Sequence, residues 1–174
     1  RRIPAPNSRE GPSMKKLSAT LLGALVVPLL VVSCGSGSNG SAEVDESPEG
    51  QAFAYRSALM QSIAWKVGQA RGMAEGEIPV DEEAFTKHAE DLVVLAGMIP
   101  EGFIPNSIVE GSAALPEIFT NMADFEAKAM DMQAAAQSLA DAAQSQGFEA
   151  AKGMVQALGQ SCGGCHRPYR QRQE

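Results

Sequence analysis

The 174-residue sequence predicts an all-α fold, an antiparallel four-helix bundle. First, hydrophobic residues make up 44% of the chain but aromatic residues only 5%, without the β-branched and aromatic enrichment that is typical of sheets. Second, apolar residues recur at spacings of three and four along four separate segments, which is the period of one helical face. Third, glycine and proline separate these segments by two short connections and one long middle loop, as in an up-and-down bundle.

The first two helices are bounded by recognisable start and stop residues. Ser47, followed by a proline, begins the first helix, and Gly76 and Pro79 end it. Asp81 caps the second helix, after which prolines and glycines mark a long loop over residues 99–115. The two apolar stripes consist of Phe53, Arg56, Met60, Ile63, Val67 and Ala70, and of Phe85, His88, Leu92, Leu95 and Ile99.

The third and fourth helices carry two further stripes. Pro116 suits the first turn of the third helix, and Gly147 separates the third helix from the fourth. Because the fourth stripe runs on to two cysteines, we expect these cysteines to face the inside of the bundle. The stripes consist of Phe119, Met122, Phe125, Ala129, Met132, Ala136, Leu139 and Ala143, and of Phe148, Ala151, Val155, Leu158, Cys162, Cys165 and Tyr169.

Residues 1–33 are expected to consist of upstream sequence followed by an export signal, and not to belong to the folded domain. Met14 is the expected start, and two lysines precede sixteen mostly apolar, uncharged residues from Leu17 to Val32. This apolar stretch is short for a permanent membrane helix. It leads into Cys34 in a pattern that resembles the bacterial lipobox, in which lipid is transferred to the thiol and the chain is cleaved just before it. The alternative is an ordinary signal peptide with an incidental cysteine.

Cleavage before Cys34 leaves a mature chain of 141 residues with a formal charge of −11, against −7 for the whole sequence. Residues 34–50 then form a flexible linker rich in glycine, serine and acid, and residues 51–174 form the helical domain. We expect a periplasmic lipoprotein that is anchored to the membrane through Cys34. The acidity argues against nucleic acid as a partner, because phosphate binding needs a basic face.

The run Cys162-Gly163-Gly164-Cys165-His166 has the spacing of the c-type haem attachment motif. Thiols three residues apart lie on one side of a helix and can add to the two vinyl groups of haem, while the following imidazole reaches the iron. Other interpretations explain less. A redox Cys-x-x-Cys pair normally lies near a βαβ pattern, a disulfide leaves the histidine unexplained, and zinc needs four ligands where only His88 and Cys34 remain. We therefore expect one covalently attached haem c, with His166 as the iron ligand.

Residues 49–172 resemble the cytochrome c prime family, including its low-spin relatives. The stretch from Tyr55 to Met60 is similar to a family segment in which an arginine lies near the haem propionates and a later residue covers the distal face of the iron. The resemblance implies these roles for Arg56 and Met60. Pro116-Glu117-Ile118-Phe119 resembles the family's Pro-Glu-Ile-Trp, and Tyr169-Arg170 resembles residues near the proximal imidazole. The chain departs from the family at Pro168, which should kink or end the last helix.

The remaining side chains can be interpreted from their spacing. Arg56 and Met60 are four residues apart and share one face. A buried arginine needs an anionic partner such as a haem propionate, and the alternative is that Arg56 extends to water. His88 is interpreted as a core or rim histidine rather than a second iron ligand. Four methionines are interpreted as packing around the cofactor rather than as ligands: Met122, Met130, Met132 and Met154.

Three functions fit such a chain. The first is an electron carrier that docks a basic redox partner protein through its acidic surface, and the second is a module that binds nitric oxide or carbon monoxide. An enzyme such as a peroxidase ranks last, because that chemistry needs a distal acid or base and the first helix offers Met60, Ile63 and Ala64. The family resemblance favours a five-coordinate iron covered by Met60 over six-coordinate His/Met ligation. It also implies homodimers through the outer faces of the first two helices.

Overall fold

Helices account for most of the part of the chain that the computed structural model describes, residues 45–172. The expectations for the signal segment, for Cys34 and for the linker up to residue 44 lie outside these residues. Short helical turns connect the long helices: η1 (Ile99–Gly102), α3 (Glu117–Thr120), α5 (Phe148–Ala151) and η2 (Lys152–Met154). The long helices are α1 (Pro48–Glu75), α2 (Glu82–Gly97), α4 (Met122–Gln146) and α6 (Val155–Tyr169).

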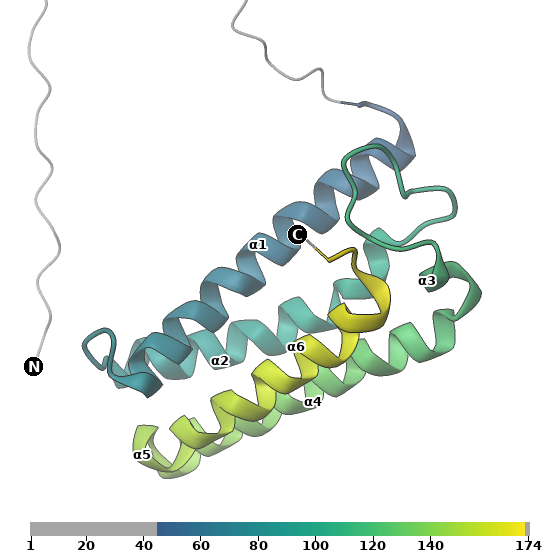
Figure 1. Ribbon diagram of the computed structural model, residues 1–174. Helices are drawn as coiled ribbons and strands as arrows, with labels where there is room; N and C mark the ends of the chain where they lie inside the picture. Colours follow the sequence, from purple (N-terminus) through teal and green to yellow (C-terminus); the bar gives the residue numbers. More distant parts are fainter. Residues whose placement is uncertain (1–44, 173–174) are drawn as a thin grey trace, which may run out of the picture. The chain divides into compact units, whose positions relative to one another are not determined.

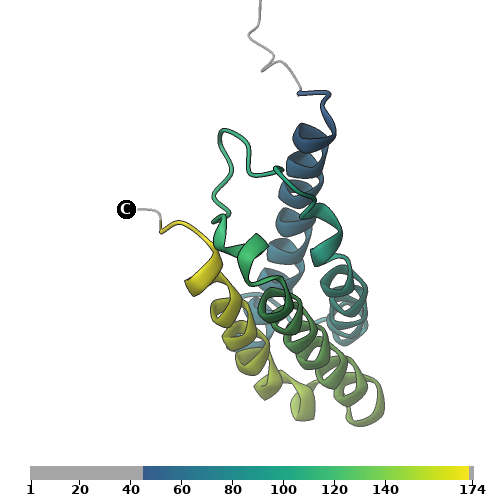
Figure 2. The same ribbon diagram turned by 90° about the vertical axis from the view of Figure 1, so that its right-hand side faces the viewer.

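The four long helices form the expected bundle, and no strand is found among residues 45–172 (Figures 1 and 2). Helix α2 packs against α1 and, more extensively, against α4, which also packs against α6. Helices α1 and α6 touch over fewer residues. The connection from α2 to α4 lies at the same end of the bundle as the C-terminal end of α6, whereas α5 lies at the opposite end (Figure 1). The prediction of an all-α bundle is confirmed.

The expected helix ends are confirmed by their capping geometry. Ser47 and Asp81 cap α1 and α2 by accepting hydrogen bonds from backbone N–H groups three residues further on, each at 3.0 Å. Gly76 ends α1 in the left-handed conformation, with φ of 76°, and Gly147 follows α4 with φ of 80°. Glycine adopts these angles without the steric cost that a Cβ atom would add, so both positions stop their helices.

Two of the expected helices are interrupted in the structure. The side-chain nitrogen of Asn121 donates to the carbonyl of Glu117 at 3.0 Å, and Asn121 has a φ of −128°, so α3 and α4 are separate. Asparagine side chains compete in this way with backbone hydrogen bonds. In the fourth segment, η2 lies between α5 and α6. Helix α6 then ends at Tyr169, one residue after Pro168, as expected for a proline that cannot donate a backbone hydrogen bond.

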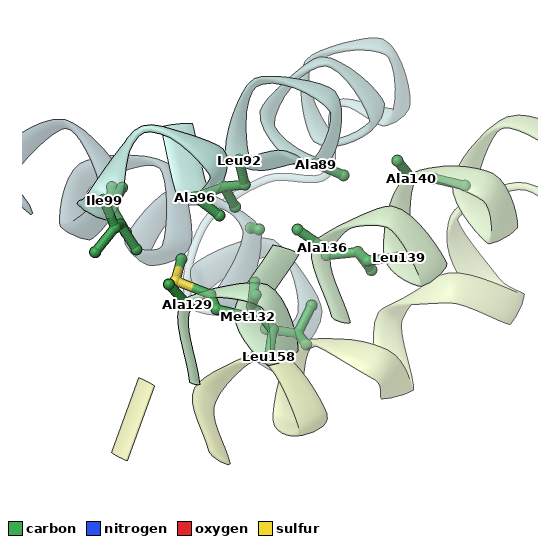
Figure 3. Close-up of a cluster of buried hydrophobic side chains, with 14 of the residues drawn as sticks. Ala89, Leu92, Ala96, Ile99, Ala129, Met132, Ala136, Leu139, Ala140 and Leu158 are labelled. Atoms are coloured by element: carbon green, nitrogen blue, oxygen red, sulfur yellow. The ribbon is translucent and has the colours of Figure 1, made fainter. Parts of the chain in front are cut away.

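Small and apolar side chains fill the interior between α2, α4 and α6 (Figure 3). Ala89 and Ala96 of α2 and Ala136 of α4 are fully buried, and their small size lets the two helices approach closely. Leu158 brings α6 into the same cluster. Among residues 45–172, no helix is both long and apolar enough to cross a membrane.

Candidate functional site

The attachment motif lies near the C-terminal end of α6. The free thiols of Cys162 and Cys165 are half-buried and pack against the hydrophobic core, as the fourth apolar stripe predicts. The Cys162 thiol donates to the carbonyl of Leu158 at 3.2 Å, and burial raises the pKa of both thiols. His166 follows on the more exposed side of the helix. The structure therefore presents two thiols and one imidazole within a single stretch of helix.

The side of the motif that carries His166 opens into a hollow of about 240 Å³. A Cβ atom on Gly164 would meet nothing within 4 Å, whereas one on Gly163 would lie 3.2 Å from the guanidinium of Arg167. The pKa of His166 is lowered, first by partial desolvation and then by the positive charge of Arg170. Six residues line the hollow: Gly163, His166, Arg167, Arg170, Gln171 and Arg172.

Hydrogen bonds hold the end of α6 that carries His166. Tyr169 is buried, and its hydroxyl donates to the Asp124 carboxylate at 2.6 Å, which raises the pKa of Tyr169 to about 12 and lowers that of Asp124. The backbone N–H of Leu115 donates to the carbonyl of Tyr169 at 3.0 Å, and Gln171 donates to Ala113 at 2.8 Å. No sequence signal singled out Asp124, because its partner lies 45 residues away on another helix.

Arg56 is buried, with 5% of its surface exposed, so the alternative that its head extends to water is wrong. Its guanidinium donates to the carbonyl of Gly102 at 2.6 Å and to the carbonyl and hydroxyl of Ser107 at 2.6 and 2.9 Å. Gly102 permits this approach, since a Cβ atom there would lie 2.4 Å from Arg56 Cγ. Within residues 45–172 the guanidinium forms no ion pair. A buried cation is thus satisfied by neutral acceptors of the loop between α2 and α3.

An aromatic chain connects this arginine with the end of α6. The Arg56 guanidinium lies 4.9 Å from the Phe103 ring centroid. Phe103 packs edge-on against Phe125 at 4.5 Å, and Phe125 packs against Tyr169 at 5.6 Å. These contacts stabilise an arrangement that joins α1, the loop, α4 and α6. Met60, one turn beyond Arg56, is partly buried and packs against the core.

His88 and the methionines do not all follow the sequence interpretation. His88 is buried at 8% exposure and packs edge-on against Trp65 at 5.3 Å, which confirms a core or rim histidine. Its Nδ1 atom has no hydrogen-bond partner in the described structure, and burial lowers its pKa. Met132 is buried as expected. Met130 and Met154 are 61% and 39% exposed, so their interpretation as packing residues is wrong, because both lie on outer helix faces.

The side chains of the motif fit a covalently attached haem. Two free thiols of the correct spacing lie on a core-facing stripe, an imidazole follows them, and a buried guanidinium lies across the bundle without a carboxylate partner. In residues 45–172, no group of three or more His, Cys, Asp or Glu side chains is arranged to hold a bare metal ion. The thiol pair, the imidazole and the buried guanidinium are the types of group that attach haem, ligate its iron and face its propionates.

Comparisons with known proteins agree with this chemistry. The family model described as Cytochrome C′ matches residues 51–170. Cytochrome c-554 of Cereibacter sphaeroides is 38% identical over 67% of this chain and 90% of its own length, and cytochrome c-556 of Agrobacterium tumefaciens is 34% identical over 66% and 93%. The solved cytochrome c prime from Shewanella frigidimarina is 34% identical, covers 73% of this chain and 98% of its own, and has a TM-score of 0.67. The chain therefore belongs to the cytochrome c′ family.

Proposed function

We propose that this chain is a periplasmic haem protein, not an enzyme, in which His166 ligates the iron and which transfers electrons and binds nitric oxide or carbon monoxide. Its family cofactor is covalently attached haem c, which supplies a redox-active iron when bound. The observation that carries the proposal is the thiol pair on the core-facing stripe of α6 with the imidazole of His166 beside it.

Each site residue has a proposed role in holding the cofactor. Cys162 and Cys165 form the two thioethers, and His166 is the axial ligand. Arg56 faces the propionates, a role supported by a buried guanidinium whose partners are all neutral. Arg170 acts on the imidazole electrostatically: partial desolvation lowers the pKa of His166 first, and the positive charge of Arg170 lowers it further.

Gas binding is proposed on the side of the iron opposite His166, with Met60 covering an open coordination position. A solved nitric oxide complex of a cytochrome c prime variant from Alcaligenes xylosoxidans is 28% identical, with a TM-score of 0.65 over 73% of this chain and 98% of its own. Met60 is partly buried beside the core residues Leu59 and Ile63 of α1, which gives this face an apolar lining. Such a lining suits small uncharged ligands.

The state of the iron tests this proposal in the purified ferric protein. We expect a high-spin spectrum in electronic absorption and electron paramagnetic resonance, and carbon monoxide binding to the ferrous form that is faster in Met60→Ala. Truncation removes the side chain that covers the ligand position, so the effect should be on the order of tenfold, about 1.4 kcal/mol in the barrier. The control Met130→Ala changes a methionine that is 61% exposed and should leave the rate unchanged. A low-spin spectrum with a weak far-red thioether-to-iron band would instead establish the alternative, a six-coordinate His/Met electron carrier.

Membrane attachment through a lipid on Cys34 is proposed from the lipobox-like sequence and the basic and apolar residues before it. The expected mass of the mature protein therefore includes a lipid on Cys34, and Cys34→Ser should move the protein from the membrane to the periplasmic fraction. Recovery of wild-type protein with an unmodified Cys34 thiol would contradict the tether.

Self-association is proposed through the outer faces of α1 and α2. Trp65 on α1 and Val94 on α2 are 57% and 64% exposed, so each helix presents one apolar side chain that a second copy would cover. Sedimentation velocity of the holoprotein should report a dimer, and a monomer at all accessible concentrations would remove this part of the proposal.

A further inference from the structure

Three arginines at the end of α6 differ from the other basic residues of the domain. Residues 45–172 contain nine basic and eighteen acidic residues, a formal charge of −9. Arg56 is buried, and five others form ion pairs with carboxylates: Lys66 and Lys87 with Asp91, Arg71 with Glu75, Lys128 with Asp124, and Lys152 with Glu149. Arg167, Arg170 and Arg172 form no ion pair with any described residue.

These three arginines lie together beside the haem attachment motif. All three are exposed, and they line the same hollow as His166. The lining residues belong to the C-terminal part of α6 and the segment after it, which pairs at Arg170 with Ala114 of the connection from α2 to α4. Figure 1 shows this end of α6 beside that connection. Glu110 lines an adjoining hollow with Arg172 but forms no ion pair with it. The uncompensated positive charge of the domain is therefore concentrated around the proximal histidine.

We propose that Arg167, Arg170 and Arg172 form the docking face for an acidic surface of a redox partner protein. This inference rests on the proposed electron-transfer function and reverses the expectation that a basic partner docks on the acidic surface. The described domain has a charge of −9, so most of its surface repels an acidic partner, and only the three arginines attract it. The electrostatic potential therefore favours the orientation that brings the partner next to His166. Weak redox complexes have small interfaces, for which three arginines are a substantial share of the charge.

The proposal is tested by the reduction of the ferric holoprotein with a reduced, acidic plant-type [2Fe–2S] ferredoxin. One electron passes from the ferredoxin cluster, which is oxidised, to the ferric haem, which becomes ferrous. We measure the second-order rate constant at an ionic strength of about 0.15 M, where a Debye length of about 8 Å screens the distant acidic residues of the domain but not arginines that contact the partner. In Arg167→Gln/Arg172→Gln the rate constant should be about tenfold lower at this ionic strength. Arg170 is left unchanged, because it has a proposed role beside the imidazole.

The matched control is Arg71→Gln/Lys152→Gln, which removes the same charge from paired residues near the C-terminal end of α1 and in η2. It should change the rate constant by less than about twofold, since exposed pairs contribute little field at a distance. Equal slowing in both double variants, or no slowing in Arg167→Gln/Arg172→Gln, would overturn the docking face.

A cationic reductant distinguishes a wrong docking face from a wrong electron-transfer function. Hexaammineruthenium(II) should reduce the wild type and both variants, and its rate should not fall in Arg167→Gln/Arg172→Gln. If neither reductant yields a ferrous spectrum, the electron-transfer function itself is wrong. Vesicles of phosphatidylcholine and phosphatidylglycerol test whether the arginines bind anionic lipid instead of a protein. The protein partner would be overturned, and the face assigned to anionic lipid, by two results together. The wild type but not Arg167→Gln/Arg172→Gln would float with these vesicles, and the ferredoxin rate constant would be the same in both proteins.

Discussion

The Cys162→Ser/Cys165→Ser variant is expected to contain no covalently bound haem, so its band in a denaturing gel should give no haem stain. Each thioether needs one thiol, and these are the two cysteines of the described chain, both half-buried on the core-facing stripe of α6. Either single variant should keep at most one thioether and mature poorly. The same preparations should be compared by acid–acetone extraction, which removes non-covalent haem only.

The third cysteine supplies the control for this experiment. Cys34→Ser should stain as strongly as the wild type, because Cys34 lies in the predicted leader and linker region rather than in the helical domain. Extraction of all colour from the wild-type band would show that the haem is not covalent. In that case the proposed roles of Cys162 and Cys165 would be wrong, although His166 would remain a candidate ligand.

Arg56→Met is expected to lower the free energy of unfolding by about 3 kcal/mol. The substitution removes the guanidinium but keeps a side chain of similar length, so the carbonyls of Gly102 and Ser107 lose their buried donor. Groups that lose a charged partner in the interior carry the full cost of desolvation. Urea unfolding of the holoprotein, followed by circular dichroism, measures the change.

Two control variants locate the effect in the buried hydrogen bonds. Arg71→Met removes an arginine that is 64% exposed and should cost less than about 1 kcal/mol. Ser112→Ala removes a 3.5 Å contact to Arg56 and a 3.3 Å hydrogen bond from the backbone N–H of Ala114. Both are long, so this variant should also have little effect. If Arg56→Met were as stable as Arg71→Met, the loop between α2 and α3 would not depend on this guanidinium.

Local sequence features determined most of the architecture. The caps at Ser47 and Asp81 and the stops at Gly76 and Gly147 act within one helical turn, so each could be identified from its neighbours. The break at Asn121 is also local, but the residue pattern alone predicts one continuous helix there. An asparagine between two apolar helical stretches permits a continuous helix, and the hydrogen bond from its side chain to Glu117 decides against one.

Part of the candidate site could also be predicted from the sequence. The motif from Cys162 to His166 is a contiguous run, and its position on an apolar stripe depends only on helical period. The exposure of Met130 and Met154 could not be inferred, because methionine is common in cores and nothing in the sequence tells which helix face has no neighbour.

The sequence by itself determined an acidic four-helix domain with a haem attachment motif near the end of its last helix, because composition, helical period and motif spacing are properties of short segments. The tertiary structure decided which polar groups meet. Arg56 reaches Gly102 and Ser107, and Tyr169 reaches Asp124, across 45 to 51 residues of chain. The same packing joins Lys66 of α1 to Asp91 of α2 and leaves three arginines unpaired around His166. The other four paired cations meet a carboxylate three or four residues away along the chain, which is a local property of the sequence. Hydrogen bonds and ion pairs need contact within a few ångströms, and only the folding of distant segments onto one another brings Arg56, Tyr169 and Lys66 so close to their partners.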